Sequence, residues 1–521
     1  MKPSDELFKL VKSLTKSEKR FFKLSSTLQS GEKNYIKLFD AIEKQIEYDE
    51  EDIKERFKKE TFIRHLPSEK NHLYKLILKS LRSYHSDNSI TSILQDEIKS
   101  VDILFSKALY GECSKIIRKA KKVAVKNERF YYLMQLISRE KMLLEEEYHS
   151  GNFDRDLNEL IAEEEIVMKQ LQNLAEYRML YSKINYVFRK GGYARNDKEK
   201  SMVQDILDHP LIKGKNTALS KTAAASCYYI QGLCALVQYK YEDSFEKFSR
   251  VVQIFEENPH LIIEIPKHYI RALNNLLFCY LDKNDYDSFF ELISKIRKLE
   301  DTPGFVSTDI KLKIFSSTYN AELIAYDKMG DYEKAINIVD NILGGIENFG
   351  QQISKEEEII FYYNIAYSYF GVDQWKNALK WINKMLNDNE QHLRQDIFSF
   401  SRLFSLIIHF ELEHYDLLEY MLKSTNRFYN KRRNEIGREY KVENLFIKYM
   451  KKLSKAANNR EKSKELLTDL QKEMLSTITE PYEKVALGYF DFLGWIEAKL
   501  NNQTFGEYKK SKLVYTSKTP V

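Results

Sequence analysis

The sequence predicts an almost entirely α-helical protein, and three observations support this fold class. The 521 residues include only 8 prolines and 17 glycines, so residues that interrupt helices are scarce. Apolar residues recur at intervals of three and four, which is the spacing of one face of a helix. Aromatic residues reach 13%, and large rings suit the interfaces between packed helices.

The charges of the chain are nearly balanced. There are 82 Lys and Arg against 77 Asp and Glu, and the net charge is +5. Such a chain lacks the global positive field of a dedicated nucleic-acid-binding protein, although local basic patches remain open. No stretch approaches the roughly 18 apolar residues that span a membrane, and residues 1–20 lack the apolar region of a signal peptide. We therefore expect a cytoplasmic protein without a membrane partner.

The four cysteines lie within apolar helical patterns, and no two of them form a CxxC pair. They are Cys113, Cys227, Cys234 and Cys279. Because this arrangement suits neither a disulfide framework nor a zinc site, we expect reduced, buried thiols.

Residues 1–88 differ from the rest and predict a small helical segment. Thr15 and Glu18 have the spacing of a capping box, which begins a helix. Asp49 heads an acidic stretch that is expected to cap a short helix ending near Phe57, and Pro67 begins a longer one.

The end of this segment is the most basic helical stretch near the N-terminus. Nine Lys or Arg and three acidic residues lie between Ile53 and His85. One interpretation is a helix-turn-helix whose second helix contacts nucleic acid, and the other is a solvated face on a helical cap. The long connection from Lys59 to Leu66 favours the second interpretation. The candidate nucleic-acid patch here consists of Lys70, Lys75, Lys79 and Arg82.

Residues 89–215 predict less regular helical hairpins. One pair of helices is expected over 130–148 and 157–174, with a break at Ser150-Gly151-Asn152. Another is expected over 177–189 and 198–207, with a break at Gly191-Gly192.

A readable repeat begins near residue 216 and is clearest around Tyr326. Gly330 can adopt a positive φ that closes one helix, and Asp331 can cap the next. The recurring pattern has an aromatic or small residue, an aromatic six residues later, a small residue after nine and a bulky apolar residue after thirteen. Five stretches fit it in part: Ala235, Tyr241, Ser244, Phe248; Tyr280, Tyr286, Phe289, Ile293; Tyr326, Tyr332, Ala335, Val339; Tyr369, Trp375, Ala378, Ile382; and His409, Tyr415, Leu418, Leu422.

These stretches resemble the tetratricopeptide repeat (TPR) family, with three departures. Phe289 and Leu418 stand where the family has a small residue, and His409 stands where it has tyrosine. The second-helix aromatics are 40 to 46 residues apart, against about 34 in the family, so longer helices are expected. The resemblance implies a right-handed α-solenoid of antiparallel helix hairpins over 216–430, followed by C-terminal helices and a cap over 431–521.

The resemblance also implies a class of function. The first helices of such hairpins line an inner surface that binds an extended peptide or a partner protein, so a non-enzymatic scaffold or adaptor is expected. The alternative is a sensor-regulator with the same repeats, whose basic N-terminal helices bind DNA. The family's groove-lining positions fall on residues that include Tyr229, Arg271, Asn274, Asn320, Asp327, Tyr363 and Tyr367.

The sequence contains no convincing motif of enzyme chemistry. Gly345 and Gly350 have the spacing of a phosphate loop, but glutamines follow where lysine and a hydroxyl residue are needed. Gly344-Gly345 is instead expected to end a helix. Glu-x-x-His recurs at sites that a solenoid would hold apart, and HExxH and GxSxG do not occur. We expect no catalytic residue, metal or cofactor.

A second basic region lies between Arg427 and Lys455. It includes Arg432 and Arg433 and is interleaved with aromatic residues, as in single-strand-binding proteins. Phe446, Tyr449 and the apolar residues after them also keep the spacing of a packed amphipathic helix. That interpretation is favoured, and a patch for nucleic acid or an acidic partner is the alternative.

Overall fold

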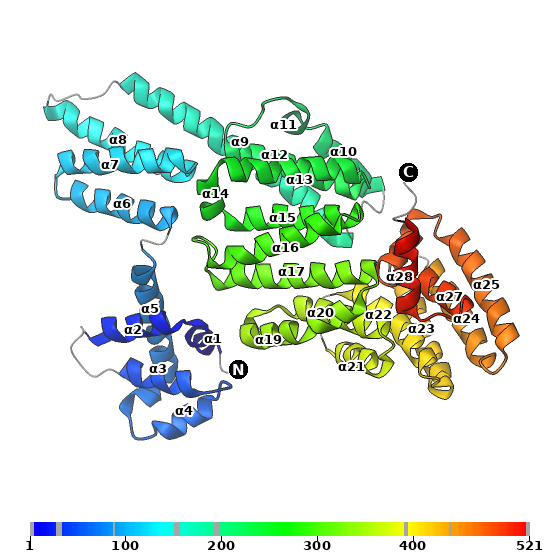
Figure 1. The fold of residues 1–521 in the computed structure, drawn as a ribbon. Coiled ribbons are helices and arrows are strands. Elements are labelled where there is room, and N and C mark those ends of the chain that lie inside the picture. The colour runs from blue at the N-terminus through cyan, green and yellow to red at the C-terminus, as the bar shows by residue number, and fades with distance from the viewer. Residues whose placement is uncertain are drawn as a thin grey trace. The chain divides into compact units, whose positions relative to one another are not determined.

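A computed structural model gives the fold (Figure 1) and describes residues 5–27, 34–86, 89–150, 157–191, 197–389, 394–436 and 440–516. Within these ranges every regular element is a helix, which confirms the all-α class. The described helices include none with both the length and the apolar character needed to cross a bilayer. The chain divides into two compact units, residues 1–175 and 176–521.

The first unit begins with short helices around their own apolar core, which includes Val11, Phe39 and Ile77. Thr15 and Glu18 form the predicted capping box, with the Thr15 amide donating to Glu18 Oε2 at 2.7 Å. Asp49 Oδ1 caps the fourth helix by accepting from the amides of Glu51 and Asp52, as predicted. The elements are α1 (Glu6–Ser13), α2 (Lys16–Thr27), α3 (Asn34–Lys44), α4 (Glu50–Arg56), the 3-10 turn η1 (Thr61–His65) and α5 (Leu66–Tyr84).

Longer helices follow, and one of them corrects a prediction. They are α6 (Ile90–Phe105), α7 (Tyr110–Lys126), α8 (Phe130–Ser150) and α9 (Leu157–Gly191). Helix α9 is continuous over 35 residues, so the two helices predicted at 157–174 and 177–189 are one. The buried Leu174, Tyr177 and Leu180 keep helical spacing across the expected gap, and no glycine or proline interrupts them. The expected breaks at 151–152 and 192 lie outside the described residues.

The second unit contains a series of adjacent helix pairs (Figure 1). It begins with the second half of α9. The elements that follow are α10 (Asp197–Leu207), α11 (Pro210–Lys213), α12 (Lys221–Val237), α13 (Tyr241–Glu257), α14 (Pro259–Glu264), α15 (Pro266–Asp282), α16 (Tyr286–Lys298), η2 (Leu299–Asp301) and α17 (Thr308–Met329). The next are α18 (Tyr332–Asn337), α19 (Val339–Phe349), η3 (Gly350–Gln352), α20 (Lys355–Gly371), α21 (Trp375–Leu386), α22 (Gln395–Glu411) and α23 (Tyr415–Ile436). The last are α24 (Lys441–Lys455), α25 (Arg460–Thr477), α26 (Pro481–Lys484), η4 (Val485–Gly488), α27 (Phe492–Leu500) and α28 (Phe505–Thr516).

The five predicted pairs share one turn geometry. The aromatic expected in each second helix is the first residue of that helix: Tyr241, Tyr286, Tyr332, Trp375 and Tyr415. Two positions earlier, the backbone is left-handed, with φ between 56° and 64°, at Tyr239, Asn284, Gly330, Asp373 and Glu413. The next amide bonds to the carbonyl five residues back, for example Asp331 N to Tyr326 O at 2.9 Å. This is the Schellman motif, which satisfies carbonyls at the helix end.

The same turn occurs in the hairpins that were predicted to be less regular. Ala108 and Glu128 have positive φ, two residues before the first residues of α7 and α8. The amide of Leu109 bonds to the Leu104 carbonyl at 3.0 Å, in the same register. The carbonyls that accept these bonds belong to Leu104 and Ala124. Leu104 departs from the aromatic or small residue of the pattern, whereas Ala124 fits it as Ala235 does.

The glycines at 344 and 345 do not end a helix, contrary to the prediction. Helix α19 runs through both and ends before Gly350, whose φ is 51°. A Cβ at Gly345 would overlap the ring of Phe315, so glycine is required there by the close approach of α17.

Candidate binding surface

Polar bonds join the first helices of neighbouring pairs. Asn275 Nδ2 on α15 donates to the Tyr229 hydroxyl on α12 at 2.9 Å. Further along, Asn364 Nδ2 on α20 donates to Asn320 Oδ1 on α17 at 3.1 Å. Two of the predicted partner-binding residues, Tyr229 and Asn320, therefore lie where adjacent first helices meet, and both are half-buried.

Two further predicted residues, Arg271 and Asn274, lie one turn apart on α15. Arg271 Nη1 donates to the hydroxyl of Tyr181 on α9 at 3.3 Å. The Tyr181 ring in turn lies 5.9 Å from the Tyr229 ring. The structure thus brings Tyr229, Arg271 and Asn274 together with Tyr181, a residue that the sequence analysis did not single out.

His268, at the start of α15, has a pKa that is lowered in part by neighbouring positive charges. Loss of water contact and the positive charges of Arg271 and Arg178 lower the pKa of His268 to about 4. His268 keeps an exposed surface even so, and at neutral pH its imidazole is uncharged.

Asp327 belongs to a different cluster, at the end of α17. Its Oδ1 accepts from the Tyr332 hydroxyl at 2.6 Å and lies 3.9 Å from Lys509 Nζ. Lys509 also pairs with Asp491 at 3.2 Å. Burial raises the pKa of Asp327 above its ordinary value, although Lys509 and the Tyr332 bond act in the opposite direction. Asp327 is therefore engaged with residues near the C-terminus.

Tyr363 and Tyr367 are covered by the chain itself. The Tyr363 hydroxyl donates to the Tyr489 carbonyl at 2.9 Å, and the Asp491 amide donates to the Tyr367 hydroxyl at 3.2 Å. Only 5% and 7% of the two tyrosines are exposed. A partner could reach these two predicted residues only if the C-terminal segment moved.

This C-terminal segment, residues 485–516, is packed closely against α17, α20 and α22. Phe490 and Phe505 are stacked with ring centroids 5.6 Å apart, and both contact the rings of Tyr367 and Phe370. A Cβ on Gly506 would collide with the Gly371 carbonyl oxygen. The spacing of the residues could not predict this contact, because it joins positions more than a hundred residues apart.

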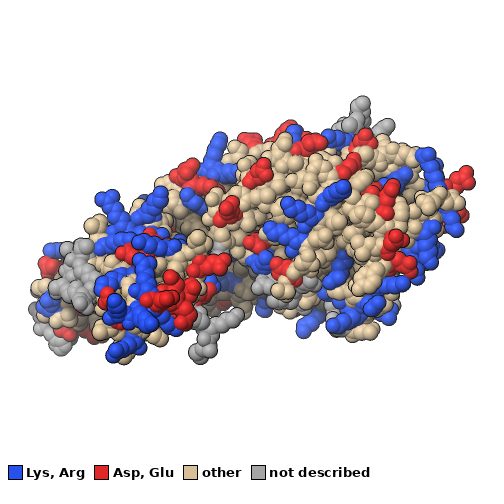
Figure 2. Space-filling view, turned by 90° about the horizontal axis from the view of Figure 1, so that it is seen from below, with Lys and Arg blue, Asp and Glu red and all other residues tan. Residues whose placement is uncertain are grey.

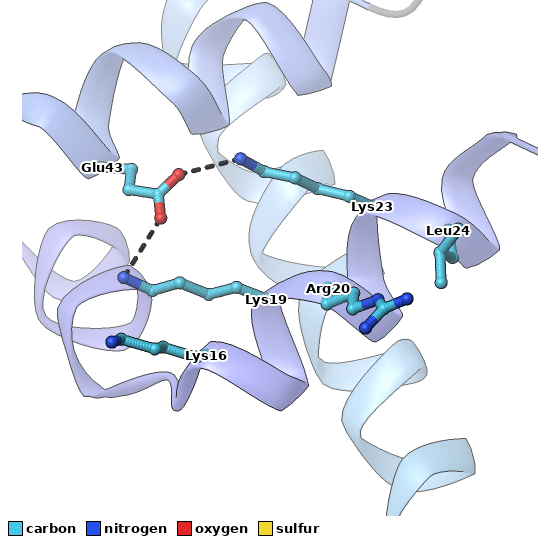
Figure 3. Close-up of a pocket in the computed structure, with 6 residues that line it drawn as sticks. All are labelled: Lys16, Lys19, Arg20, Lys23, Leu24 and Glu43. Atoms are coloured by element: carbon cyan, nitrogen blue, oxygen red, sulfur yellow. Dashed lines mark hydrogen bonds and ion pairs between the residues drawn. The ribbon is translucent and has the colours of Figure 1, made fainter.

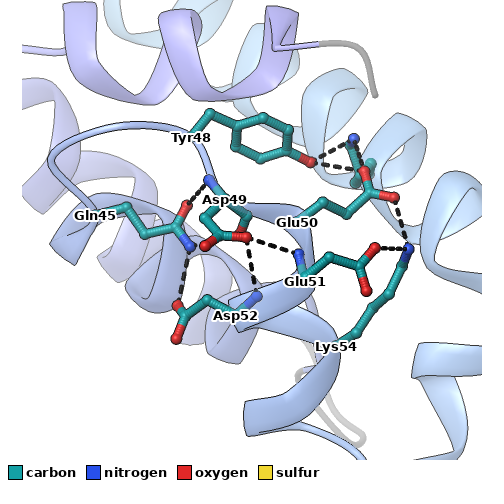
Figure 4. Close-up of polar contacts among 8 residues, drawn as sticks. Gln45, Tyr48, Asp49, Glu50, Glu51, Asp52 and Lys54 are labelled. Carbon is teal, nitrogen blue, oxygen red and sulfur yellow. Dashed lines mark hydrogen bonds and ion pairs between the residues drawn. The ribbon is translucent and has the colours of Figure 1, made fainter. Parts of the chain in front are cut away.

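The candidate nucleic-acid residues at the N-terminus divide into two kinds. Lys70 is paired: its Nζ donates to the Tyr48 hydroxyl at 2.6 Å and to Glu50 Oε2 at 2.9 Å. Figure 4 shows these two partners, with Tyr48 just before α4 and Glu50 at its start. Lys75, Lys79 and Arg82 are exposed along α5 and make no ion pair with a described residue. Lys70 therefore links α5 to the start of α4 through its ion pair, while Lys75, Lys79 and Arg82 form a basic face on α5.

Helix α2 carries a second group of basic residues beside a shallow pocket (Figure 3). Lys19 and Lys23 point to Glu43 of α3, at 3.2 Å and 2.9 Å. Partial burial alone would raise the pKa of Glu43, but the bonds from these lysines outweigh it and hold the pKa below its ordinary value. The basic residues that line this pocket are Lys16, Lys19, Arg20 and Lys23, and two of them, Lys19 and Lys23, are thus neutralised by Glu43.

The second basic region is largely a packed helix. Phe446, Tyr449 and Leu453 of α24 are buried, so these rings are not available for stacking with bases. Arg432 lies beside the Phe428 ring and bonds to the Tyr440 hydroxyl at 3.4 Å, whereas Arg433 is exposed. On the face shown in Figure 2, basic and acidic side chains are interspersed.

The residues that could support other chemistry are dispersed. All four cysteines are free thiols, and only Cys227 is not fully buried. Burial raises the pKa of Cys234 to about 12, which keeps it a thiol. Over the described ranges, no group of three or more His, Cys, Asp or Glu is arranged to hold a metal ion. No protein-family model matches the sequence, and a search of curated proteins finds no significant match.

Proposed function

We propose that this chain is a non-enzymatic scaffold or adaptor of the cytoplasm that binds a partner protein or peptide along its first helices. In this proposal, the hairpins form a TPR-like α-solenoid, and residues of α12, α15 and α17 line its groove. The observation that carries the proposal is the row of polar side chains on adjacent first helices, namely Tyr229, Arg271, Asn274 and Asn320.

The shared turn geometry supports the solenoid part of the proposal. When each pair turns through the same Schellman motif, consecutive first helices have equivalent positions in their hairpins. Equivalent positions on stacked hairpins produce a continuous surface suited to an extended partner. Because Tyr363 and Tyr367 are covered, the proposed contact with the partner is made by α12, α15 and α17.

A photocrosslinking residue on α15 tests the proposal. Phe278 is 42% exposed on the same side of α15 as Arg271 and Asn274 by helical spacing, and Tyr420 on α23 is 69% exposed. We expect p-benzoylphenylalanine at 278 to crosslink one dominant protein in the native cell, identified by mass spectrometry. The same residue at 420 is the matched control. Identical products from the two positions, or none from 278, would exclude a partner on α15.

A second function, nucleic-acid binding by the N-terminal helices, rests on Lys75, Lys79 and Arg82. Their spacing places three unpaired charges on one face of α5. If this face contacts duplex DNA, neutralising all three to glutamine should reduce the salt dependence of binding by about one unit per lost contact.

The control is a triple variant of the same spacing on α7, at Lys115, Lys119 and Lys122, which are also exposed. Binding of the full-length protein to a labelled duplex is measured by fluorescence anisotropy between low and physiological salt. Absence of binding even at low salt, or an equal effect of the two triple variants, would remove this candidate function.

A further inference from the structure

An unneutralised positive charge lies on the surface formed by α9 and α15. The only bonded partner of the Arg271 guanidinium among the described residues is the neutral hydroxyl of Tyr181. Arg178, on α9, makes no ion pair or side-chain hydrogen bond with a described residue. Arg271 is half-buried, and an arginine in such a position is normally paired with a carboxylate. Arg178 is exposed and adds a second positive charge, so this arrangement lacks a negative partner among the described residues.

The histidine beside these arginines supports the same conclusion. Among the described residues, Arg271 and Arg178 are the charged groups that act on His268, both lower its pKa, and no carboxylate acts in the opposite direction. An anion bound here would meet two guanidinium groups without displacing an existing salt bridge. Arginine is also the side chain best suited to hold carboxylate or phosphate oxygens in pairs.

An acceptor without a partner lies one turn further along α15. Asn274 Oδ1 is buried and has no hydrogen bond within the described part of the chain. A buried acceptor in this state costs free energy, but the oxygen is enclosed, so a ligand on the surface meets Arg271 rather than Asn274. A peptide offers the complementary group for Arg271, because an acidic side chain can accept from its guanidinium.

We propose that the surface of Arg178, Tyr181, His268 and Arg271 binds an anionic group, a carboxylate or a phosphate, carried by a partner peptide. This proposal deepens the scaffold function and rests on it for the identity of the partner. The anion-binding property itself belongs to the surface and can be measured without the partner.

The test uses three probes with the full-length protein: inorganic phosphate, acetyl-tetraglutamate amide and acetyl-tetraglutamine amide. We expect the first or second probe to bind, as measured by calorimetry, and the uncharged third probe not to bind. Binding of phosphate alone assigns a phosphate ligand, and binding of tetraglutamate alone assigns a carboxylate ligand. Failure of both, or equal binding of tetraglutamine, would overturn the proposal.

Substitutions locate the site. Arg178→Gln and Arg271→Gln should each weaken binding at least tenfold, whereas Arg118→Gln, an exposed control on α7, should leave it unchanged. Arg178 is exposed, so its variant remains informative if Arg271→Gln fails to fold. An equal loss in the Arg118 variant would overturn the assignment to this surface.

A spectroscopic readout is independent of affinity. In protein with ¹³C-labelled histidine, the bound anion should move the pKa of His268 upward from about 4, because it offsets the two arginine charges. An unchanged His268 titration at saturating probe would place the anion elsewhere and overturn the proposal. If these tests succeed while crosslinking from position 278 fails, the anion site is retained and the peptide partner is rejected.

Discussion

Replacing Phe490 by alanine is expected to lower the free energy of unfolding of the second unit by about 3–5 kcal/mol. Phe490 is fully buried, and its ring contacts those of Tyr367, Phe404 and Phe505. The substitution removes the apolar contact and leaves a cavity between rings that are held by several helices, so the site can collapse only in part.

The three tryptophans make this loss measurable. Trp375, Trp381 and Trp495 all lie in or against the core of the second unit, so tryptophan fluorescence in a urea titration reports on that unit alone. Phe490→Leu should cost less than about 1.5 kcal/mol, because it keeps most of the volume. Phe278→Ala, at a half-exposed position, should have a smaller effect than Phe490→Ala. A loss below about 1 kcal/mol for Phe490→Ala would show that the C-terminal segment is not an integral part of this core.

The second large effect is expected at Glu411, where α22 ends. Its carboxylate accepts from Trp495 Nε1 at 2.6 Å and pairs with Lys499, and only 5% of its side chain is exposed. Glu411→Ala should destabilise the second unit by about 3 kcal/mol, because it leaves a buried indole N–H and a lysine without their acceptor.

Glu411→Gln separates the contribution of the Trp495 hydrogen bond from that of the Lys499 ion pair. The amide oxygen can still accept from Trp495, while the partly exposed Lys499 can turn to water, so we expect roughly half of the loss. Glu419→Ala removes an exposed pair with Lys423 and should change stability by less than about 0.5 kcal/mol. The measurements are urea titrations followed by tryptophan emission, whose Trp495 contribution should shift to longer wavelength in Glu411→Ala. Equal stabilities of the alanine and wild-type proteins would contradict this assignment.

Local sequence signals predicted the helix boundaries of the hairpins well. The aromatics at 241, 286, 332, 375 and 415 begin helices because a Schellman turn fixes the distance between the end of one helix and the start of the next. Glycine marks this turn only at 330; the other four pairs use residues such as Asn284 and Asp373. The spacing of the aromatic residues therefore predicted these turns better than the presence of a glycine did.

The same local signals could not predict contacts between residues that are far apart in the sequence. Nothing in the spacing around Tyr363 distinguishes a residue that meets a ligand from one that meets Tyr489, because both require an inward-facing tyrosine. Lys70 illustrates the same limit for charge, since its pairing with Glu50 depends on how α4 and α5 cross. Asn274 and Arg271 were expected from the groove-lining positions of the family that the sequence resembles, whereas only the fold shows Tyr181 beside Arg271.

The packing of residues 485–516 has a consequence for synthesis of the chain. Tyr363 and Tyr489 are separated by 126 positions, so α20 cannot acquire its final neighbours until synthesis has passed residue 489 and this segment has left the ribosome. Until then, the apolar surfaces of Phe370 and Phe404 remain without the aromatic residues that cover them in the native state. Such late closure slows folding and exposes nascent chains to aggregation. Folding of α20 and α22 thus depends on the synthesis of residues 485–516, and until then their apolar surfaces are open to aggregation.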